Sequence, residues 1–379
     1  MNRTLTLLAS VFTVALSTTA AETPVDFSRE ILPILSNKCF VCHGPDSRKE
    51  DLLRLDSFEG ATSDLGGYRA VDPGDLAKSE IIARIHDEDD PMPPEDAEKQ
   101  LTAAERALLK RWVLQGGGYT EHWAFVPPTR PTPPSQDYPI DAFIENQFTG
   151  DTDFAAEADK PTLARRLALV LTGLPPSPEF LQSFLDDGGS NAYEQLVERL
   201  LADPRYGEHQ ARYWLDAVRY GDTHGLHLDN KRGIYPYRDW VVRALNRNQP
   251  LDEFIEWQLA GDLLPEPTME QRIATGYVRM NPTTAEGGVI PAEFQAKNNF
   301  DRTETLGTVF LGMTMLCSRC HTHKYDPIEQ TEYYRLLAFF NNTAEGPLDG
   351  NKYDYAPTLK VPADQAAWND WTHLESARD

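Results

Sequence analysis

Hydrophobic positions along the chain recur mainly with the spacing of an α-helix, and few runs alternate with the period of two that a β-strand requires. In the first third of the chain the pattern predicts helices over residues 26–37 and 81–86. A further helix begins at Leu101 and Thr102 and is ended by the glycines at 116–118. This part is therefore expected to be helical.

The larger C-terminal part continues the helical pattern. One long helix is predicted to begin near residue 291 and to lead into a Cys-x-x-Cys pair, and residues 356–361 form the one predicted strand. Shorter helices are predicted over residues 162–172, 177–185, 192–201, 207–220, 237–246 and 254–259. The fold class expected from these patterns is all-α.

A proline-rich stretch separates the two helical parts. Residues 119–140 contain Pro127, Pro128, Pro131, Pro133, Pro134 and Pro139, a composition typical of a semi-rigid, extended connector. We therefore predict a small domain over residues 22–118 and a larger one over residues 141–345. Residues 346–379 follow as a C-terminal extension.

The first residues have the pattern of a cleaved leader. Arg3 precedes an apolar run over residues 5–16, and small residues follow over 17–21. The run is too short to span a bilayer comfortably, and no other stretch is apolar enough for stable membrane insertion. We therefore expect a signal peptide over residues 1–21 and an exported protein, periplasmic in a bacterium.

Composition and charge limit the classes of partner that the chain can bind. Of the 379 residues 40% are hydrophobic, which is enough for sizeable packed cores, and the net charge is −23. Nucleic acid and anionic membrane surfaces repel such a chain, whereas a basic redox partner suits it.

The four cysteines carry the most specific signal. Cys39 and Cys42 precede His43, and Cys317 and Cys320 precede His321. Disulfides or a redox dithiol do not explain a histidine directly after each pair, and a structural zinc site would require the pairs to converge. Two thiols one turn apart, followed by an imidazole, match covalent haem attachment. Two haem c groups are predicted.

The axial ligands are predicted with unequal support. At the first motif His43 is the proximal ligand, and Met92, on a loop stiffened by prolines, is the predicted distal ligand in preference to His86. At the second motif His321 is proximal and the distal ligand stays open. The candidates are His224 and His227, then Met280, while His323, Met313 and Met315 lie too close to the motif in sequence.

Two polar residues beside these histidines are candidates for acid–base chemistry. Tyr220 and Asp222 precede His224 on the same loop, where they could act next to an open iron. We take them as candidate catalytic residues.

The chain resembles a known family over nearly all of its mature length. Residues 39–112 resemble the planctomycete-type cytochrome c domain (the PSCyt family), and residues 141–342 resemble the uncharacterised helical domain that accompanies it. The matching segments are LARR (163–166), LTGLP (171–175), RYGDT (219–223), YRDW (237–240), QLAGD (258–262) and CHTHKYDPI (320–328). Such proteins usually continue into another C-terminal domain, so we expect a fragment or a naturally short member.

Three functions are compatible with these features. The first is a dihaem oxidoreductase, in which the helical domain acts on a small substrate, for example a carbohydrate-derived one, and the N-terminal cytochrome passes electrons to a partner. The second is an electron carrier without a substrate site. The third is a non-enzymatic binding module with structural haems.

Overall fold

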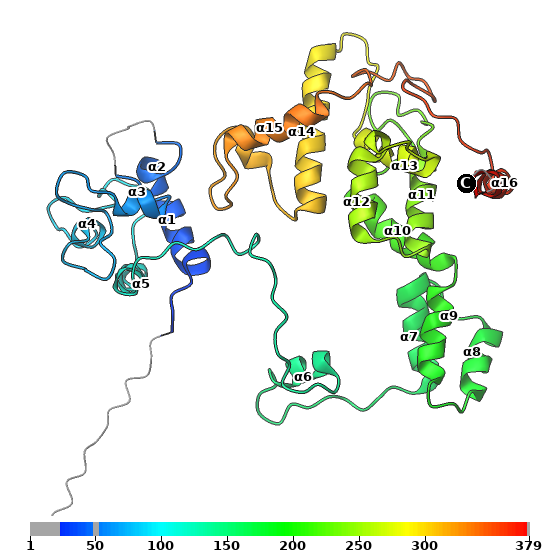
Figure 1. Cartoon of the computed structure of the whole chain (residues 1–379), viewed down its shortest axis with the longest axis horizontal. Helices are drawn as coiled ribbons and strands as arrows, with labels where there is room; N and C mark the ends of the chain where they lie inside the picture. Colours follow the sequence, from blue (N-terminus) through cyan, green and yellow to red (C-terminus); the bar gives the residue numbers. More distant parts are fainter. Residues whose placement is uncertain (1–22, 48–52, 377–379) are drawn as a thin grey trace, which may run out of the picture. The chain divides into compact units, whose positions relative to one another are not determined.

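The computed structural model describes residues 23–47 and 53–376, so the predicted leader lies outside the described residues (Figure 1). The chain divides into two compact units. Unit 1 runs to Pro128 and includes Lys324–Pro327, and unit 2 comprises Thr129–His323 and Ile328–Asp379. Regular secondary structure in the described residues is helical apart from isolated β-bridges, which confirms the all-α prediction.

Unit 1 is built from short helices and loops. Asp26 caps the first helical segment by accepting a hydrogen bond from the backbone N–H of Arg29, and Thr102 and Glu105 form a reciprocal capping box at the last helix. The helices are η1 (Phe27–Ile31), α1 (Leu32–Lys38), α2 (Phe40–His43), α3 (Phe58–Thr62), α4 (Glu80–Arg84) and α5 (Ala103–Leu114).

The core of unit 1 positions the first cysteine motif. Ile31, Leu35, Leu109 and Val113 are fully buried, and η1 packs against α5. Cys39, at the end of α1, is partly buried against the same cluster. The motif therefore begins on a packed surface rather than in a free loop.

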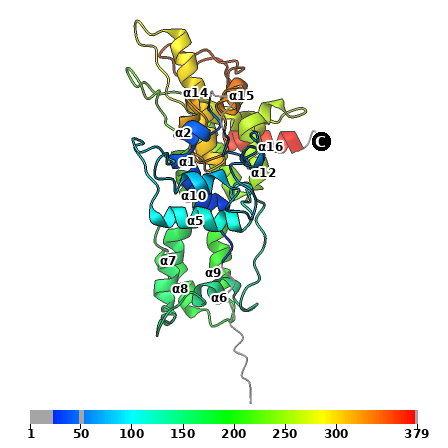
Figure 2. The ribbon, with the colours of Figure 1, turned by 90° about the vertical axis from the view of Figure 1, so that its left-hand side faces the viewer.

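Unit 2 begins with α6 (Pro139–Glu145) and a group of three helices around a small core. Asp159 and Ser177 cap the first two of these helices through side-chain oxygens. The three helices pack on one another, and the first also packs on α10 (Figures 1 and 2). They are α7 (Lys160–Thr172), α8 (Pro178–Asp186) and α9 (Ala192–Leu201).

The main core of unit 2 is aromatic. Trp240 stacks on Phe254 with ring centroids 5.1 Å apart, and Tyr237 lies 5.9 Å from Trp240. The surrounding elements are α10 (Arg205–Ala217), α11 (Tyr235–Asn246), α12 (Leu251–Ala260), η2 (Gly261–Leu263), α13 (Met269–Ala274) and η3 (Thr275–Arg279).

The last elements are α14 (Pro291–Phe310), η4 (Leu316–Arg319), α15 (Gln330–Phe340) and α16 (Gln365–Ser376). Two predictions are wrong here. The long helix does not lead into the second motif but ends at Phe310, where Gly312 turns the chain with φ +63. Residues 356–361 form no strand, and the carbonyl of Pro357 accepts a hydrogen bond from the Arg279 side chain rather than from a neighbouring strand.

Residues 346–361, which we call the strap, fold back onto the helices of unit 2. The backbone N–H of Gly233 donates to the carbonyl of Tyr353 at 2.8 Å. Arg279 donates to the carbonyls of Tyr355 and Pro357 at 2.9 and 2.7 Å. The strap therefore contributes to the packing of unit 2.

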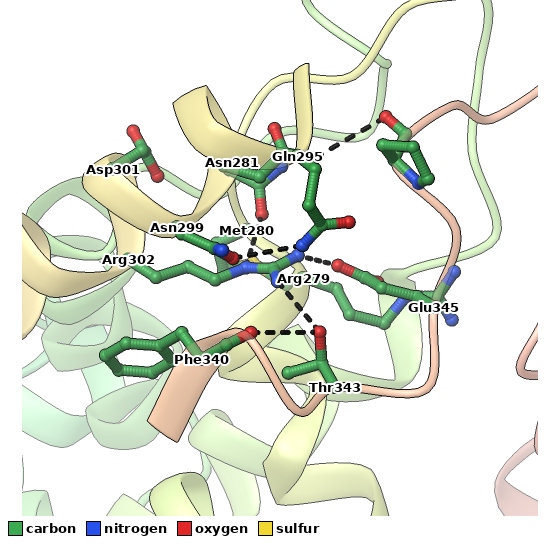
Figure 3. A network of polar contacts seen from close by, with 12 residues as sticks. Arg279, Met280, Asn281, Gln295, Asn299, Asp301, Arg302, Phe340, Thr343 and Glu345 are labelled. Atoms are coloured by element: carbon green, nitrogen blue, oxygen red, sulfur yellow. Dashed lines mark hydrogen bonds and ion pairs between the residues drawn. The ribbon is translucent and has the colours of Figure 1, made fainter. Parts of the chain in front are cut away.

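A buried polar network lies where the strap begins (Figure 3). Arg302 donates to Asn281 Oδ1 and to Thr343 Oγ1, both at 3.1 Å, and pairs with the carboxylate of Glu345. Arg279 pairs with the same carboxylate at 3.0 Å. Two guanidinium groups thus share one buried carboxylate.

Within the part of the chain that the structure describes, no helix combines the length and apolar character needed to cross a membrane.

Candidate functional site

The first cysteine motif forms one turn of helix. The backbone N–H groups of Cys42 and His43 both donate to the carbonyl of Cys39, at 3.1 and 2.9 Å. This turn carries two sulfurs and an imidazole as the attachment of a porphyrin requires. Burial raises the pKa of the Cys39 thiol to about 12, whereas Cys42 is exposed.

The backbone of unit 1 fixes the orientation of His43. Its Nδ1 lies 2.8 Å from the carbonyl oxygen of Leu53, which can only accept, so Nδ1 carries the proton. The lone pair is then on Nε2, the nitrogen that an axial iron ligand uses. The N–H of Leu55 donates to the carbonyl of His43 at 2.9 Å, so Leu53 and Leu55 both contact His43 through their backbone.

The second motif repeats this arrangement. The N–H groups of Cys320 and His321 donate to the carbonyl of Cys317 at 3.2 and 3.3 Å. His321 Nδ1 lies 2.7 Å from the carbonyl of Thr322, which again leaves the lone pair on Nε2. Both thiols are free and exposed. The two motifs therefore share a backbone turn and a histidine tautomer.

Helices α14 and α15 hold the second motif through Arg319, one of the residues between its cysteines. The guanidinium of Arg319 lies 3.9 Å from the ring of Phe300 and 3.5 Å from Glu304 Oε1. The hydroxyl of Tyr333 donates to the same Glu304 oxygen at 3.0 Å, and that of Tyr334 donates to the Arg319 carbonyl at 2.9 Å. Sequence reasoning missed these partners, because their only signal was the arginine inside the motif.

The residues at both motifs fit a covalently attached haem. Each offers two free thiols and one imidazole nitrogen on a single turn. Each also exposes an apolar side chain that a porphyrin face would cover, namely Val41, 85% exposed, and Leu316, 53% exposed. The donor set and its surroundings thus suit the group at each motif.

The predicted distal ligand of the first site lies on a loop of unit 1. The N–H of Met92 donates to the carbonyl of Arg84 at 2.9 Å, which ties the loop to the end of α4, and the side chain is half-buried. His86 is exposed. Met92 as the iron ligand stays a prediction.

His224 has a different set of partners from the one predicted. It is 1% exposed, with Nδ1 2.7 Å from Thr283 Oγ1 and 3.2 Å from Asp349 Oδ2. Nε2 lies 2.9 Å from the carbonyl of Lys352 and therefore donates to it. As placed, the imidazole ties the strap to the loop and presents no free lone pair to an iron.

His227 lies three residues further on the same loop and is exposed. It has φ +56, a left-handed conformation that this loop imposes on it. Its ring is open to solvent, so its role as the distal ligand stays a prediction.

The structure brings the two candidate catalytic residues together. The hydroxyl of Tyr220 donates to Asp222 Oδ1 at 2.5 Å, and Arg238 Nη1 lies 3.6 Å from the same oxygen. Burial, and then the hydrogen bond to the Asp222 carboxylate, raise the pKa of Tyr220. The phenol therefore stays protonated near neutral pH and acts as a hydrogen-bond donor.

Comparisons with known proteins identify the two parts of the chain. Residues 39–96 match the family described as Planctomycete cytochrome C. Residues 139–345, more than half of the chain, match the family described as Protein of unknown function (DUF1549). No curated protein and no solved structure matched. The chain belongs to the planctomycete cytochrome c (PSCyt) family, and it is a c-type cytochrome whose N-terminal domain binds haem c covalently.

Proposed function

We propose that this protein is an exported dihaem cytochrome that couples electron transfer to an oxidoreductase activity in unit 2. The observation that carries the proposal is the repeated geometry of the two motifs. Cys317, Cys320 and His321 adopt the hydrogen-bonded turn that Cys39, Cys42 and His43 adopt in the family-matched cytochrome domain. The second haem would be attached to Cys317 and Cys320, with His321 as its proximal ligand.

The two haems would have different tasks. A haem with His and Met ligands supplies one-electron transfer, whereas a haem with a replaceable ligand supplies substrate chemistry. His43 and Met92 would provide the first ligand set. No distal ligand is assigned at the second motif; a replaceable ligand there, with the hydrogen-bonded Tyr220–Asp222 pair as acid and base, would permit a substrate reaction. The phenol can deliver a proton, and the carboxylate beside it can take up the proton that a donor releases.

Localisation and partners follow from the leader pattern and the charge. The leader predicted over residues 1–21 supports export to the periplasm, and a net charge of −23 favours a basic redox partner. The substrate would be a small molecule, for example one derived from a carbohydrate. Electrons would move between this substrate at the second haem and the partner at the first.

Haem counting tests the central claim. Three proteins are produced in a host with haem-attachment machinery: the unaltered chain, C39S/C42S and C317S/C320S. A pyridine haemochrome assay and an intact mass are recorded for each. We expect two haems in the unaltered chain and one in each double variant. One haem in the unaltered chain, unchanged in C317S/C320S, would remove the second site.

Ligand binding separates the enzyme from its alternatives. If a coordination position at the second haem can be vacated, CO shifts the spectrum of one ferrous haem in the native protein. If both irons refuse CO and cyanide without denaturation, a pure electron carrier or a binding module with structural haems replaces the oxidoreductase. The C317S/C320S protein is the control, because its remaining haem should not bind CO.

A further inference from the structure

Unit 2 contains a cavity of about 270 Å³ that the sequence did not reveal. It lies between the start of α11, the η2 and η3 segments with α13, and the end of the strap. Its lining includes Tyr237, Asp262, Arg272, Thr275, Tyr353 and Thr358. Tyr220 and Asp222 do not line it, so it is separate from the pair described above.

The strap wall of this cavity is held in place by hydrogen bonds. Arg279 donates to the carbonyls of Tyr355 and Pro357, and its guanidinium lies 4.1 Å from the ring of Tyr355. Glu345 holds Arg279 from the other side at 3.0 Å (Figure 3). Because these donors are already used, Arg279 shapes the wall rather than offering a charge to a ligand.

The opposite wall approaches the strap closely at Gly233. A Cβ at this position would lie 2.5 Å from Asp354 Oδ1 and 3.0 Å from Tyr353 Cε1. A larger residue here would have to displace these strap side chains, and the backbone hydrogen bond from Gly233 to the carbonyl of Tyr353 holds the two walls together. The cavity is formed by fixed walls, which is the usual condition of a small-molecule site.

The lining combines groups that suit one class of ligand. Asp262 and Asp354 bring negative charge and Arg272 and Arg279 bring positive charge, so the formal charges of the lining balance. Thr275 and Thr358 add hydroxyl groups; that of Thr275 donates to the carbonyl of Arg272 at 2.7 Å and can still accept from a ligand. A ligand with several hydroxyl groups can donate to the carboxylates and accept from the guanidinium of Arg272 at the same time.

Aromatic and aliphatic side chains complete the lining. The ring of Tyr353 and the side chains of Ile273 and Leu359 present apolar surface beside these polar groups. The negative face of an aromatic ring attracts the positively polarised C–H bonds of a saturated ring. A saturated ring that carries hydroxyl groups satisfies both kinds of wall.

We propose that this cavity binds a neutral polyhydroxylated ring compound, a monosaccharide or a cyclic polyol. Binding requires only the walls described here and does not depend on haem. That this ligand is also the substrate rests on the proposed function.

Calorimetry on the full, haem-loaded chain tests the proposal. The probes are neutral compounds (D-glucose, D-galactose, D-mannose, L-fucose and myo-inositol), with glucuronate and glucosamine as charged comparators. We expect at least one neutral probe to bind at least tenfold more tightly than either comparator. No binding by any neutral probe, or tighter binding by a charged one, would overturn the proposal.

Variants then locate the binding. D262N removes an exposed carboxylate from the rim and should weaken binding at least tenfold, while T275W should fill the cavity and abolish it. D216N, on the exposed surface of α10, is the matched control and should bind as the unaltered chain does. If D262N and D216N bind equally and T275W folds and still binds, the ligand lies elsewhere and the assignment to this cavity fails.

Haem content measured on the same samples distinguishes a failure of the cavity proposal from a failure of the dihaem proposal. Binding that persists in C317S/C320S supports the cavity whether or not a second haem exists. Two haems without binding would leave the dihaem proposal standing and remove the ligand.

Discussion

Replacing Glu345 by Gln removes the one carboxylate that the buried Arg302 shares with the partly buried Arg279. The side chain of Arg302 is 1% exposed and that of Glu345 is 8% exposed, and Arg279 contacts the same carboxylate at 3.0 Å. Burial lowers the pKa of Arg302 to about 10, which still leaves it charged at neutral pH. The E345Q protein must therefore bury an uncompensated positive charge.

The expected cost follows from this burial. Removing one partner of a buried ion pair costs about 3–5 kcal/mol, and the amide oxygen of Gln retains one acceptor, so we expect about 3 kcal/mol for E345Q. Glu293 offers a matched control, because it pairs with Lys297 at 2.6 Å while both side chains are more than half exposed. E293Q should cost roughly 0.5 kcal/mol or less.

Urea denaturation of the full chain, followed by tryptophan fluorescence, measures the difference. Trp240 lies in the core of unit 2 and reports its transition. With a slope of roughly 3 kcal/mol per M, E345Q should lower the urea midpoint by about 1 M. R302M/E345Q should recover part of this loss, because Met in place of Arg302 removes the buried charge that E345Q leaves without its partner. A midpoint for E345Q that equals that of E293Q would refute the reasoning.

Three further outcomes are expected. Because burial raises the pKa of Cys39 from 9.0 to about 12, the folded apoprotein at pH 9 holds about a thousandth of this thiol as thiolate, against about half when unfolded. Iodoacetamide labelling of Cys39, followed by peptide mass mapping, should therefore be roughly 500-fold slower in the folded apoprotein than in urea, and equal rates would contradict the burial. The same shift stabilises the folded apoprotein below pH 9, and this contribution is lost as the pH rises from 9 to 12. H224A should lower stability by about 2 kcal/mol without changing the haem spectrum, whereas H227A should alter the spectrum of the second haem alone; the reverse pattern would place His224 on the iron. Y220F should lower substrate turnover while haem content and folding stay unchanged, and unaltered turnover would remove the hydroxyl from the reaction.

Most of the helices could be predicted because their signal is local. The helix predicted over residues 192–201 has the same bounds in the structure, since its apolar spacing is unbroken from Ala192 to Leu201. The helix predicted over residues 207–220 instead ends at Ala217, and Arg219 has φ +53. There the hydrophobic spacing continues past the end of the helix, but the chain turns at Arg219, whose guanidinium donates to Asp301 on α14.

The candidate site shows the same division between local and distant information. The two Cys-x-x-Cys-His motifs could be recognised because every atom they need lies within one turn. The partners of His224 could not, because Thr283 and Lys352 lie 59 and 128 positions away in sequence. A loop histidine near other polar residues looks like a ligand until the acceptors that occupy its nitrogens are known.

The strap contributes to the candidate site although it lies outside the family-matched residues. The family-matched residues end at 345, and the sequence alone favoured a separate extension from residue 346. In the structure, however, the strap supplies a buried Asp349 to His224 and carbonyl groups to Arg279. It also forms one wall of the cavity. If the chain ended at residue 345, His224 would lose two of its partners and Arg279 two of its acceptors. The loop that carries Tyr220 and Asp222 is hydrogen-bonded to the strap through His224 and Gly233. The geometry of the candidate site therefore depends on a segment outside the matched family.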